Sequence, residues 1–204
     1  MATQSDLFGA SVDGPSAEGG VAGLSAWDGV VTSGEEAALI AAIDACALSP
    51  FRFQGWEGKR LTASFGWRYD FDTGAFGPTE PMPDWLLPVR DRAAALAGLA
   101  VDALVQALVI RYDPGAGIGW HRDRPQFEHV IGLSLGSAAT LRLRRRTAAG
   151  RSGFARASAP LTPRGLYHLT GDVRQLWEHS IAPGDVPRWS ITFRSLSETG
   201  RRAA

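Results

Sequence analysis

A succession of short β-prone segments in the second half of the chain limits the fold more than any other feature of the sequence. From Leu104 onward, apolar and β-branched stretches alternate with clusters of Gly, Pro, Asp and Ser that favour turns. These stretches predict strands at 104–112, 117–122, 128–135, 139–146, 153–158, 164–169 and 188–195. Short strands at this spacing favour a double-sheet jelly roll over a helical or parallel fold.

Two helices are predicted before these strands, so the expected fold class is mainly β with flanking helices (α+β). Thr32 offers a capping side chain ahead of the alanine-rich segment 37–43, which predicts a helix that ends near residues 48–50. Apolar residues recur at helical spacing over 83–99 and predict a second helix. Pro88 inside that segment can break it into two pieces.

The composition argues against several classes of protein. The opening residues 1–29 have neither a basic start nor an apolar run, so they do not resemble a secretory signal. No window approaches the about 20 apolar residues of a membrane span, and we expect a soluble, cytoplasmic protein. Cys46, the only cysteine, excludes an internal disulfide and a cysteine-rich zinc site, and we expect it to be a small buried hydrophobic residue.

Positive charge is concentrated in the second half of a chain whose formal net charge is zero. Residues 101–204 carry 15 Arg and no Lys against eight Asp and Glu. This asymmetry permits a polyanionic substrate at that half. The neutral total argues against strong, sequence-independent DNA binding.

A possible metal site follows the first of the predicted core strands. Asp113, Pro114 and Gly115 form a turn signal, and residues 118–123 alternate like a second strand. Because residues two apart in a strand face the same side, His121 and Asp123 can point at one ion. A second histidine would complete a 2-His-1-carboxylate triad, which leaves metal positions open and suits non-haem Fe(II). Alone, a His-x-Asp pair is also common as surface polar residues.

The order His121-x-Asp123, then His179, then Arg188-x5-Arg194 resembles the AlkB family of Fe(II)/2-oxoglutarate dioxygenases. The resemblance covers about residues 50–197 and includes Tyr112 before the first ligand. It implies a double-stranded β-helix that uses Fe(II), 2-oxoglutarate and dioxygen, with the two histidines and Asp123 as catalytic metal ligands.

The resemblance also implies how the co-substrate is held. Arg188 would bind the distal carboxylate of 2-oxoglutarate with help from the Tyr112 hydroxyl, while Arg194 would lie nearer the metal-bound end. Ser190 is also expected among the residues that bind the co-substrate. A guanidinium is suited to this role because its planar fork grips a carboxylate through two hydrogen bonds. The implied reaction is oxidative demethylation of alkylated DNA or RNA bases.

Residues 53–70, dense in aromatic and basic side chains separated by glycines, are the candidate substrate lid, and Phe65-Gly66-Trp67 resembles a motif of the family there. Aromatic rings stack on bases and cations contact phosphates. The predicted substrate contacts are Lys59, Arg60, Trp67, Arg68 and Tyr69. An aromatic hairpin that supports the sheet is an equal alternative for Trp67 and Tyr69, and a scaffold role is favoured for Phe65.

The expected organisation is one domain with extensions, since 204 residues with 45% hydrophobic content can bury a sizeable core. We expect a disordered or loosely attached arm at 1–30 and a helical and substrate-lid segment at 31–103. The double-stranded β-helix core follows at 104–197, and a tail at 198–204.

Three positions depart from the pattern of nucleobase-repair members. Ile110 and Ser190 stand where many of them have Asn, and Pro125 stands where an acid contacts the damaged base. These departures keep a second hypothesis open, in which the same chemistry acts on a protein side chain or a small molecule. A non-catalytic binding module on the jelly-roll scaffold is a third, less favoured hypothesis.

Two other features have structural explanations. The alternating segment 139–146 ends in an arginine run, which indicates a solvated outer face or, alternatively, a phosphate-contacting edge. His129 and His168 lack the partner spacing of a ligand pair and are expected to pack within or behind strands. The expected partner is an alkylated nucleic acid, with no membrane and no disulfide partner.

Overall fold

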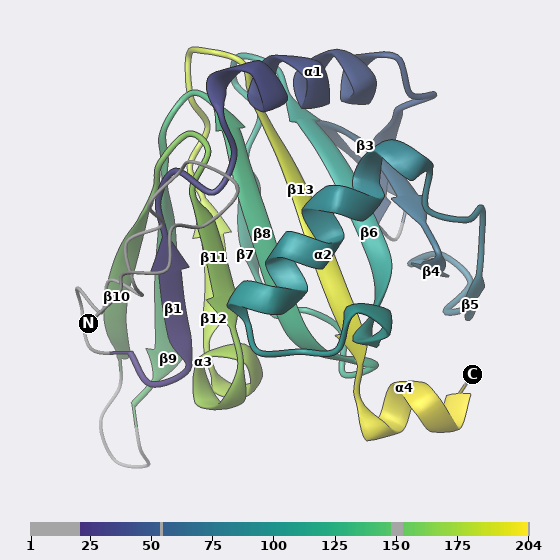
Figure 1. Ribbon diagram of the computed structural model, residues 1–204. Helices are drawn as coiled ribbons and strands as arrows, with labels where there is room; N and C mark the ends of the chain where they lie inside the picture. Colours follow the sequence, from purple (N-terminus) through teal and green to yellow (C-terminus); the bar gives the residue numbers. More distant parts are fainter. Residues whose placement is uncertain (1–20, 54, 148–152, 204) are drawn as a thin grey trace, which may run out of the picture.

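The computed structural model describes residues 21–53, 55–147 and 153–203. Within these residues two antiparallel sheets face each other (Figure 1). The larger sheet has the order β1 (Leu24–Trp27), β11 (Leu166–Leu169), β8 (Phe127–Gly136), β13 (Arg188–Leu196), β6 (Leu104–Tyr112), β3 (Trp56–Phe65) and β2 (Ser49–Phe53). The smaller sheet has the order β10 (Phe154–Leu161), β9 (Ala139–Arg146), β12 (Glu178–Ile181) and β7 (Ile118–His121). The prediction of a mainly β jelly roll is confirmed.

The strands predicted from the sequence are all present, with ends shifted by a few residues. The segments not predicted as strands are β1, β2, β3, β12 and the small pair β4 (Trp67–Tyr69) and β5 (Phe76–Pro78). The candidate lid is therefore largely strand, because β3 is paired with β2 on one side and with β6 on the other. Its mixture of basic, aromatic and glycine residues hides the alternation that identifies a strand.

The helices differ from the predictions at their ends. Thr32 and Glu35 form a reciprocal capping box at the start of α1 (Ser33–Asp44). That helix ends before the predicted 48–50, because the chain enters β2 at Ser49. Pro88 lies in the first turn of α2 (Leu87–Leu96), where its missing N–H costs nothing, so it begins this helix after a short 3-10 turn, η1 (Asp84–Leu86).

Three short elements complete the described part of the chain. A 3-10 turn, η2 (Val101–Ala103), leads into β6, and α3 (Gly171–Leu176) connects β11 to β12. The predicted tail contains α4 (Glu198–Ala203). Among the helices of the described residues, none combines the length and apolar character needed to cross a bilayer.

The prediction of a disordered or loosely attached arm is wrong for residues 24–27, which form strand β1. Residues 1–20 lie outside the described part of the chain, but β1 pairs with β11 along its whole length. Trp27 at its end is buried against the main core. The abundance of Gly, Ser and Ala masked this strand, whose attachment depends on one tryptophan and on backbone hydrogen bonds.

Cys46 was expected to be buried but is only half-buried, and its thiol donates to the Ala42 carbonyl oxygen.

Two hydrophobic clusters decide which face of the large sheet is free for a site. Helices α1 and α2 cover one face, where Ile43 and Ala93 are fully buried with Ile131, Leu133 and Phe193 (Figure 1). A second cluster, around Leu141 and Leu143 of β9, lies between the sheets. Each fully buried side chain of this kind contributes about 1.5–3 kcal/mol. Residues of β13 that face away from the helices therefore point into the space between the sheets.

Candidate active site

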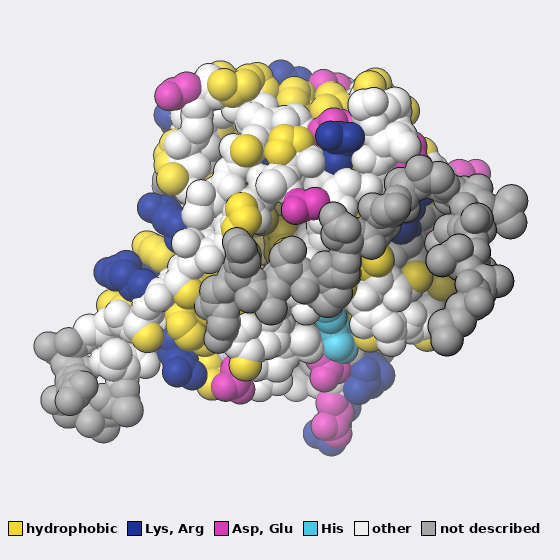
Figure 2. Space-filling model, turned by 60° about the vertical axis from the view of Figure 1, so that its left-hand side comes forward, with side chains coloured by type: hydrophobic (Ala, Val, Ile, Leu, Met, Phe, Trp, Pro, Cys, Tyr) yellow, Lys and Arg dark blue, Asp and Glu magenta, His cyan; other side chains and the backbone are white. Residues whose placement is uncertain are grey.

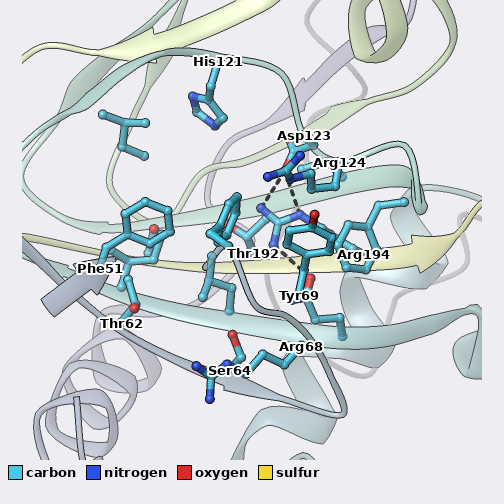
Figure 3. A pocket seen from close by; sticks show the side chains of 18 of the residues that line it. Phe51, Thr62, Ser64, Arg68, Tyr69, His121, Asp123, Arg124, Thr192 and Arg194 are labelled. Atoms are coloured by element: carbon cyan, nitrogen blue, oxygen red, sulfur yellow. Dashed lines mark hydrogen bonds and ion pairs between the residues drawn. The ribbon is translucent and has the colours of Figure 1, made fainter. Parts of the chain in front are cut away.

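A large open cavity of about 1970 Å³ occupies the space between the two sheets. The alternate residues Arg188, Ser190, Thr192 and Arg194 of β13 line it, since their side chains share one face of the strand. Figure 3 shows Thr192, Arg194 and Tyr69 near the centre of the view, with His121 and Asp123 above them.

His121, Asp123 and His179 come together at one wall of the cavity. His121 ends β7 and lies directly opposite His179 of β12, with ring centroids 4.2 Å apart. One ligand atom from each of the three residues lies within 4.8 Å of the others. The strand ends at His121, so Asp123 reaches the cluster from the following loop and not by strand alternation as predicted.

A β-bulge in β7 determines where His121 points. His179 is opposite His121 and Ile181 is opposite Ile118, so one extra residue is accommodated on β7. Ile118 and His121, three apart in sequence, can thus both face inward. Trp120 lies between them and contacts side chains on the outer face of the small sheet.

The free atoms of the cluster fit a divalent metal ion. The Nδ1 of His121 lies 2.9 Å from the Gly119 carbonyl oxygen, to which it donates, leaving Nε2 as a free lone pair. Asp123 Oδ2 is buried without a hydrogen-bond partner among the described residues and lies 3.5 Å from His179 Nε2. Two imidazoles and one carboxylate on one side of an open cavity form the facial arrangement that suits Fe(II).

The electrostatics keep the three groups ready to ligate. Burial lowers the pKa of His121 and lowers the pKa of His179 to about 3, so both rings are neutral near pH 7. Burial alone would raise the pKa of Asp123. The adjacent Arg194 guanidinium makes the largest opposing contribution, and the pKa of Asp123 lies below its usual value, so the carboxylate is ionised.

Arg194 is engaged by the chain itself. Its Nε and Nη2 lie 2.9 and 2.8 Å from Asp123 Oδ1, and its Nη1 donates to Gln106 Oε1 at 3.0 Å. Figure 3 shows this pair as dashed lines beside Tyr69. Arg194 therefore orients the carboxylate and leaves the second carboxylate oxygen to the metal. A contact of Arg194 with 2-oxoglutarate stays a prediction.

Arg188 has an uncompensated charge, in contrast to Arg194. Its side chain is buried, donates to Ser134 Oγ at 3.0 and 3.3 Å, and lies 5.0 Å from the centroid of the Tyr112 ring. Its Nη1 has no hydrogen-bond partner among the described residues, and no carboxylate there pairs with it. Since a buried, unpaired guanidinium is costly, a bound carboxylate is a suitable partner. Ser190 is buried on the same strand face.

Several residues of the site were missed by sequence reasoning. Gln106 accepts a hydrogen bond from Arg194, and Ser134 accepts one from Arg188. Tyr167 lines the cavity, and burial raises the pKa of its hydroxyl to about 12. Its ring packs over Gly132, where an added Cβ would lie only 2.3 Å away. These are single polar residues within apolar strands, and only cross-strand register brings them to the site.

Only some of the predicted substrate contacts lie at the cavity. Arg60, Arg68 and Tyr69 line the cavity, whereas Lys59 and Trp67 are not among its lining residues. Trp67 packs on the Phe76 ring with centroids 5.1 Å apart, which agrees with the scaffold alternative. Phe65 packs against the core beneath the helices but also borders the cavity.

Aromatic rings and guanidinium groups alternate at the mouth of the cavity. Arg60 lies 3.8 Å from the Phe51 ring centroid, and burial lowers the pKa of its guanidinium. Arg124, one residue after the metal ligand Asp123, lies 4.3 Å from the Tyr69 ring centroid. Figure 3 shows Arg124 and Tyr69 together beside Asp123.

His129 and His168 are outside the cavity. Nδ1 of His129 and Nε2 of His168 are 2.9 Å apart, so one ring donates to the other between β8 and β11. They are absent from the metal-ligand cluster found among the described residues. Both therefore have the packing role expected from the sequence.

Comparisons with known proteins agree with this geometry. The family model of the 2OG-Fe(II) oxygenase superfamily matches residues 56–196, more than half of the chain. An uncharacterized protein of Acanthamoeba polyphaga mimivirus is 32% identical over 104 residues, covering 45% of this chain and 48% of that protein. The tRNA (carboxymethyluridine(34)-5-O)-methyltransferase ALKBH8 of Mus musculus is 27% identical over 169 residues, covering 79% of this chain and 24% of that protein.

The chain thus spans about half and about a quarter of the lengths of these two relatives. The solved structure of OsALKBH1 matches in fold, with a TM-score of 0.64 at 14% identity, and the match covers 85% of this chain and 96% of that one. From the family match, the shared fold and the His-Asp-His cluster, the chain belongs to the 2OG-Fe(II) oxygenase superfamily, as an AlkB-like oxygenase that uses Fe(II), 2-oxoglutarate and dioxygen.

Proposed function

We propose that this oxygenase removes alkyl groups oxidatively from bases in DNA or RNA. The observation that carries the proposal is the stack of Arg124 on Tyr69 at the cavity mouth, directly after the metal ligand Asp123. An aromatic ring supports an unpaired base, and guanidinium groups contact the phosphates beside it. One relative, the mouse protein, is named for an activity on tRNA, which favours a nucleic-acid substrate here.

Each part of the cavity has a proposed task. His121, Asp123 and His179 would hold Fe(II), and Arg188 with Tyr112 and Ser190 would hold 2-oxoglutarate. When bound, Fe(II) and 2-oxoglutarate would supply the oxidation of an N-methyl carbon by dioxygen, in which 2-oxoglutarate would be converted to succinate and carbon dioxide and the hydroxymethyl group would leave as formaldehyde. The protein positions the methyl group and excludes water. Apolar walls such as Ile118, Val130 and Leu141 serve the second task.

A second candidate keeps this chemistry but acts on a protein side chain or a small molecule. Pro125 favours it, because Pro125 lines the cavity where repair members of the family have an acid that contacts the damaged base. Its backbone carbonyl accepts a hydrogen bond from Ser197, and its ring offers no hydrogen bond to a base.

The two candidates are separated by measuring formaldehyde and succinate together. Anaerobically purified protein loaded with Fe(II) and 2-oxoglutarate is supplied with a panel of methylated single- and double-stranded DNA and RNA oligonucleotides. Formaldehyde release that disappears in His179→Ala supports the demethylase and identifies the strand type. Succinate formed without formaldehyde from any oligonucleotide contradicts the proposal and directs the search to proteins and small molecules.

A further inference from the structure

The outer face of the small sheet has a composition that neither the metal site nor the core explains. Along β9 the residues Leu141 and Leu143 point into the core, so Arg142, Arg144 and Arg146 point outward. On the neighbouring strand β10, Arg156 is opposite Arg144 and Phe154 is opposite Arg146. We name this surface the arginine face; it consists of Arg142, Arg144, Arg146 and Arg156 with the rings of Trp120 and Phe154.

The arginine face has an excess of positive charge. Arg144 pairs with Glu178 at 2.6 Å, whereas in the described part of the chain no carboxylate pairs with Arg142, Arg146 or Arg156. Like charges directly opposite each other destabilise a sheet, and Arg144 and Arg156 are such a pair. Glu178 compensates Arg144 in this pair, whereas the charge of Arg156 has no carboxylate partner among the described residues, so the surface suits a polyanionic partner.

Aromatic rings interleave with these arginines. The Trp120 ring centroid lies 4.4 Å from the Arg144 guanidinium and 5.3 Å from that of Arg142. Phe154 lies 4.5 Å from Arg144 and 5.5 Å from Arg146. Such contacts hold the guanidinium groups in place while leaving N–H groups for phosphates. Figure 2, which brings the β1 and β10 side forward, shows basic side chains spaced along its left edge.

The arginine face is continuous with the cavity mouth. Trp120 and Glu178 line the cavity, and both contact Arg144. They are also the residues next to the metal ligands His121 and His179, on the opposite side of the same strands. A chain that leaves the cavity across Trp120 therefore arrives on the arginine face.

We propose that the arginine face binds the sugar-phosphate backbone of a single-stranded nucleic acid whose target base lies in the cavity, with a neighbouring base stacked at Trp120. This inference deepens the proposed function and depends on it for the occupant of the cavity. A single strand is favoured because partly exposed rings between arginines stack on unpaired bases. An acidic peptide would use the charges but not the rings.

The test compares two variants that remove equal charge. Arg146→Gln/Arg156→Gln removes two charges from the arginine face, and neither side chain has a carboxylate partner among the described residues. Arg90→Gln/Arg164→Gln removes two charges near the helices, where these residues pair with Asp91 and Glu36. Fluorescence anisotropy with a labelled single strand of about 20 nucleotides gives Kd for each variant over a range of salt concentrations.

The arginine-face variant is expected to raise Kd about tenfold and to lower the slope of log Kd against log salt by about 1.4, the loss of two phosphate contacts. The control variant should leave both values unchanged. The proposal is overturned if the two variants change Kd equally. It is also overturned if the arginine-face variant leaves Kd unchanged while its melting temperature is intact. Displacement of the oligonucleotide by poly-glutamate at an equal concentration of charge overturns it as well, since this would indicate a general polyanion site.

Binding and demethylation are measured separately, so the two proposals can fail separately. Tight binding that depends on Arg146 and Arg156, with no formaldehyde from any methylated strand, would retain the arginine face and refute the demethylase. Formaldehyde release with an unchanged Kd in the arginine-face variant would retain the demethylase and refute the role of the arginine face.

Discussion

Lys59 and Arg60 are neighbours in β3, but their side chains have different surroundings. Lys59 is exposed, whereas Arg60 lines the cavity above Phe51 with its Nε lacking a hydrogen-bond partner among the described residues. Since successive side chains of a strand point to opposite faces, only one of the two can contact a substrate in the cavity. From the sequence alone, both residues were expected to contact the substrate.

We predict that Arg60→Met raises KM for a methylated oligonucleotide by about tenfold, because a charge-assisted hydrogen bond to phosphate contributes roughly 1.5 kcal/mol. Lys59→Met, the matched control, should leave KM unchanged. Steady-state formaldehyde kinetics check both. An increase of KM in Lys59→Met alone would mean that the substrate passes outside the cavity.

His168 makes stability depend on pH. Burial, with His129 adjacent, lowers the pKa of His168 from 6.5 to about 4, so the folded state prefers the neutral ring. Its contribution is complete above pH 6.5 and is lost as pH falls from 6.5 toward 4, because the unfolded chain takes up the proton first. We expect a loss of roughly 1–3 kcal/mol over that range.

Urea unfolding at several pH values measures this effect. His121 and His179 have lowered pKa values as well and contribute in the same direction. The difference between the unmodified protein and His168→Gln isolates the part due to His168. Parallel curves for the two proteins would contradict the assignment.

At the scale of single elements, Gly66 determines how the lid segment attaches to the sheet. It connects β3 to β4 with φ +76°, and an added Cβ would lie 2.0 Å from the Val105 carbonyl oxygen. Its N–H donates to the Glu80 carbonyl oxygen at 2.6 Å, and its own carbonyl accepts from Thr79. A side chain at this position therefore breaks contacts on both sides.

We predict that Gly66→Ala lowers the free energy of unfolding by about 3 kcal/mol, through both the left-handed backbone and the clash. Gly34→Ala is the matched control, since Gly34 lies in α1 with open space around its Cβ position. It should stabilise by up to about 1 kcal/mol. Urea denaturation measures both, and similar values for the two variants would refute the argument.

The sequence predicted the elements that have one strong periodicity. Strands β6, β8 and β13 are apolar and bounded by turn residues, so their existence and approximate ends were readable. Strand β12 was missed because its sequence, Glu-His-Ser-Ile, contains only one apolar residue, although His179 within it was identified. The partners Gln106 and Ser134 were not predictable, since their roles depend on contacts between strands distant in sequence.

At the scale of the whole molecule, the metal cluster joins the small sheet to the loop that leads to β8, while Arg188 belongs to the large sheet. Ligands that bind only the folded state stabilise it by about 2.7 kcal/mol at 100 times Kd. We predict that Mn(II), a redox-silent substitute for Fe(II), raises the melting temperature by about 5 °C and that 2-oxoglutarate adds a further increase.

Two variants separate these contributions in the same melting experiment. His179→Ala should abolish both increases, because the metal site is lost. Arg188→Met should keep the increase due to Mn(II) and lose the one due to 2-oxoglutarate. A full response to 2-oxoglutarate in Arg188→Met would show that the distal carboxylate is held by another residue.

The bulge in β7 has an evolutionary consequence. In a regular strand, residues three apart face opposite sides, so the strand would present either Ile118 to the core or His121 to the cavity. With one extra residue between them, both face inward. A single inserted codon is therefore enough to turn an edge strand that serves only packing into one that also presents a metal ligand, while the residues already packed keep their places.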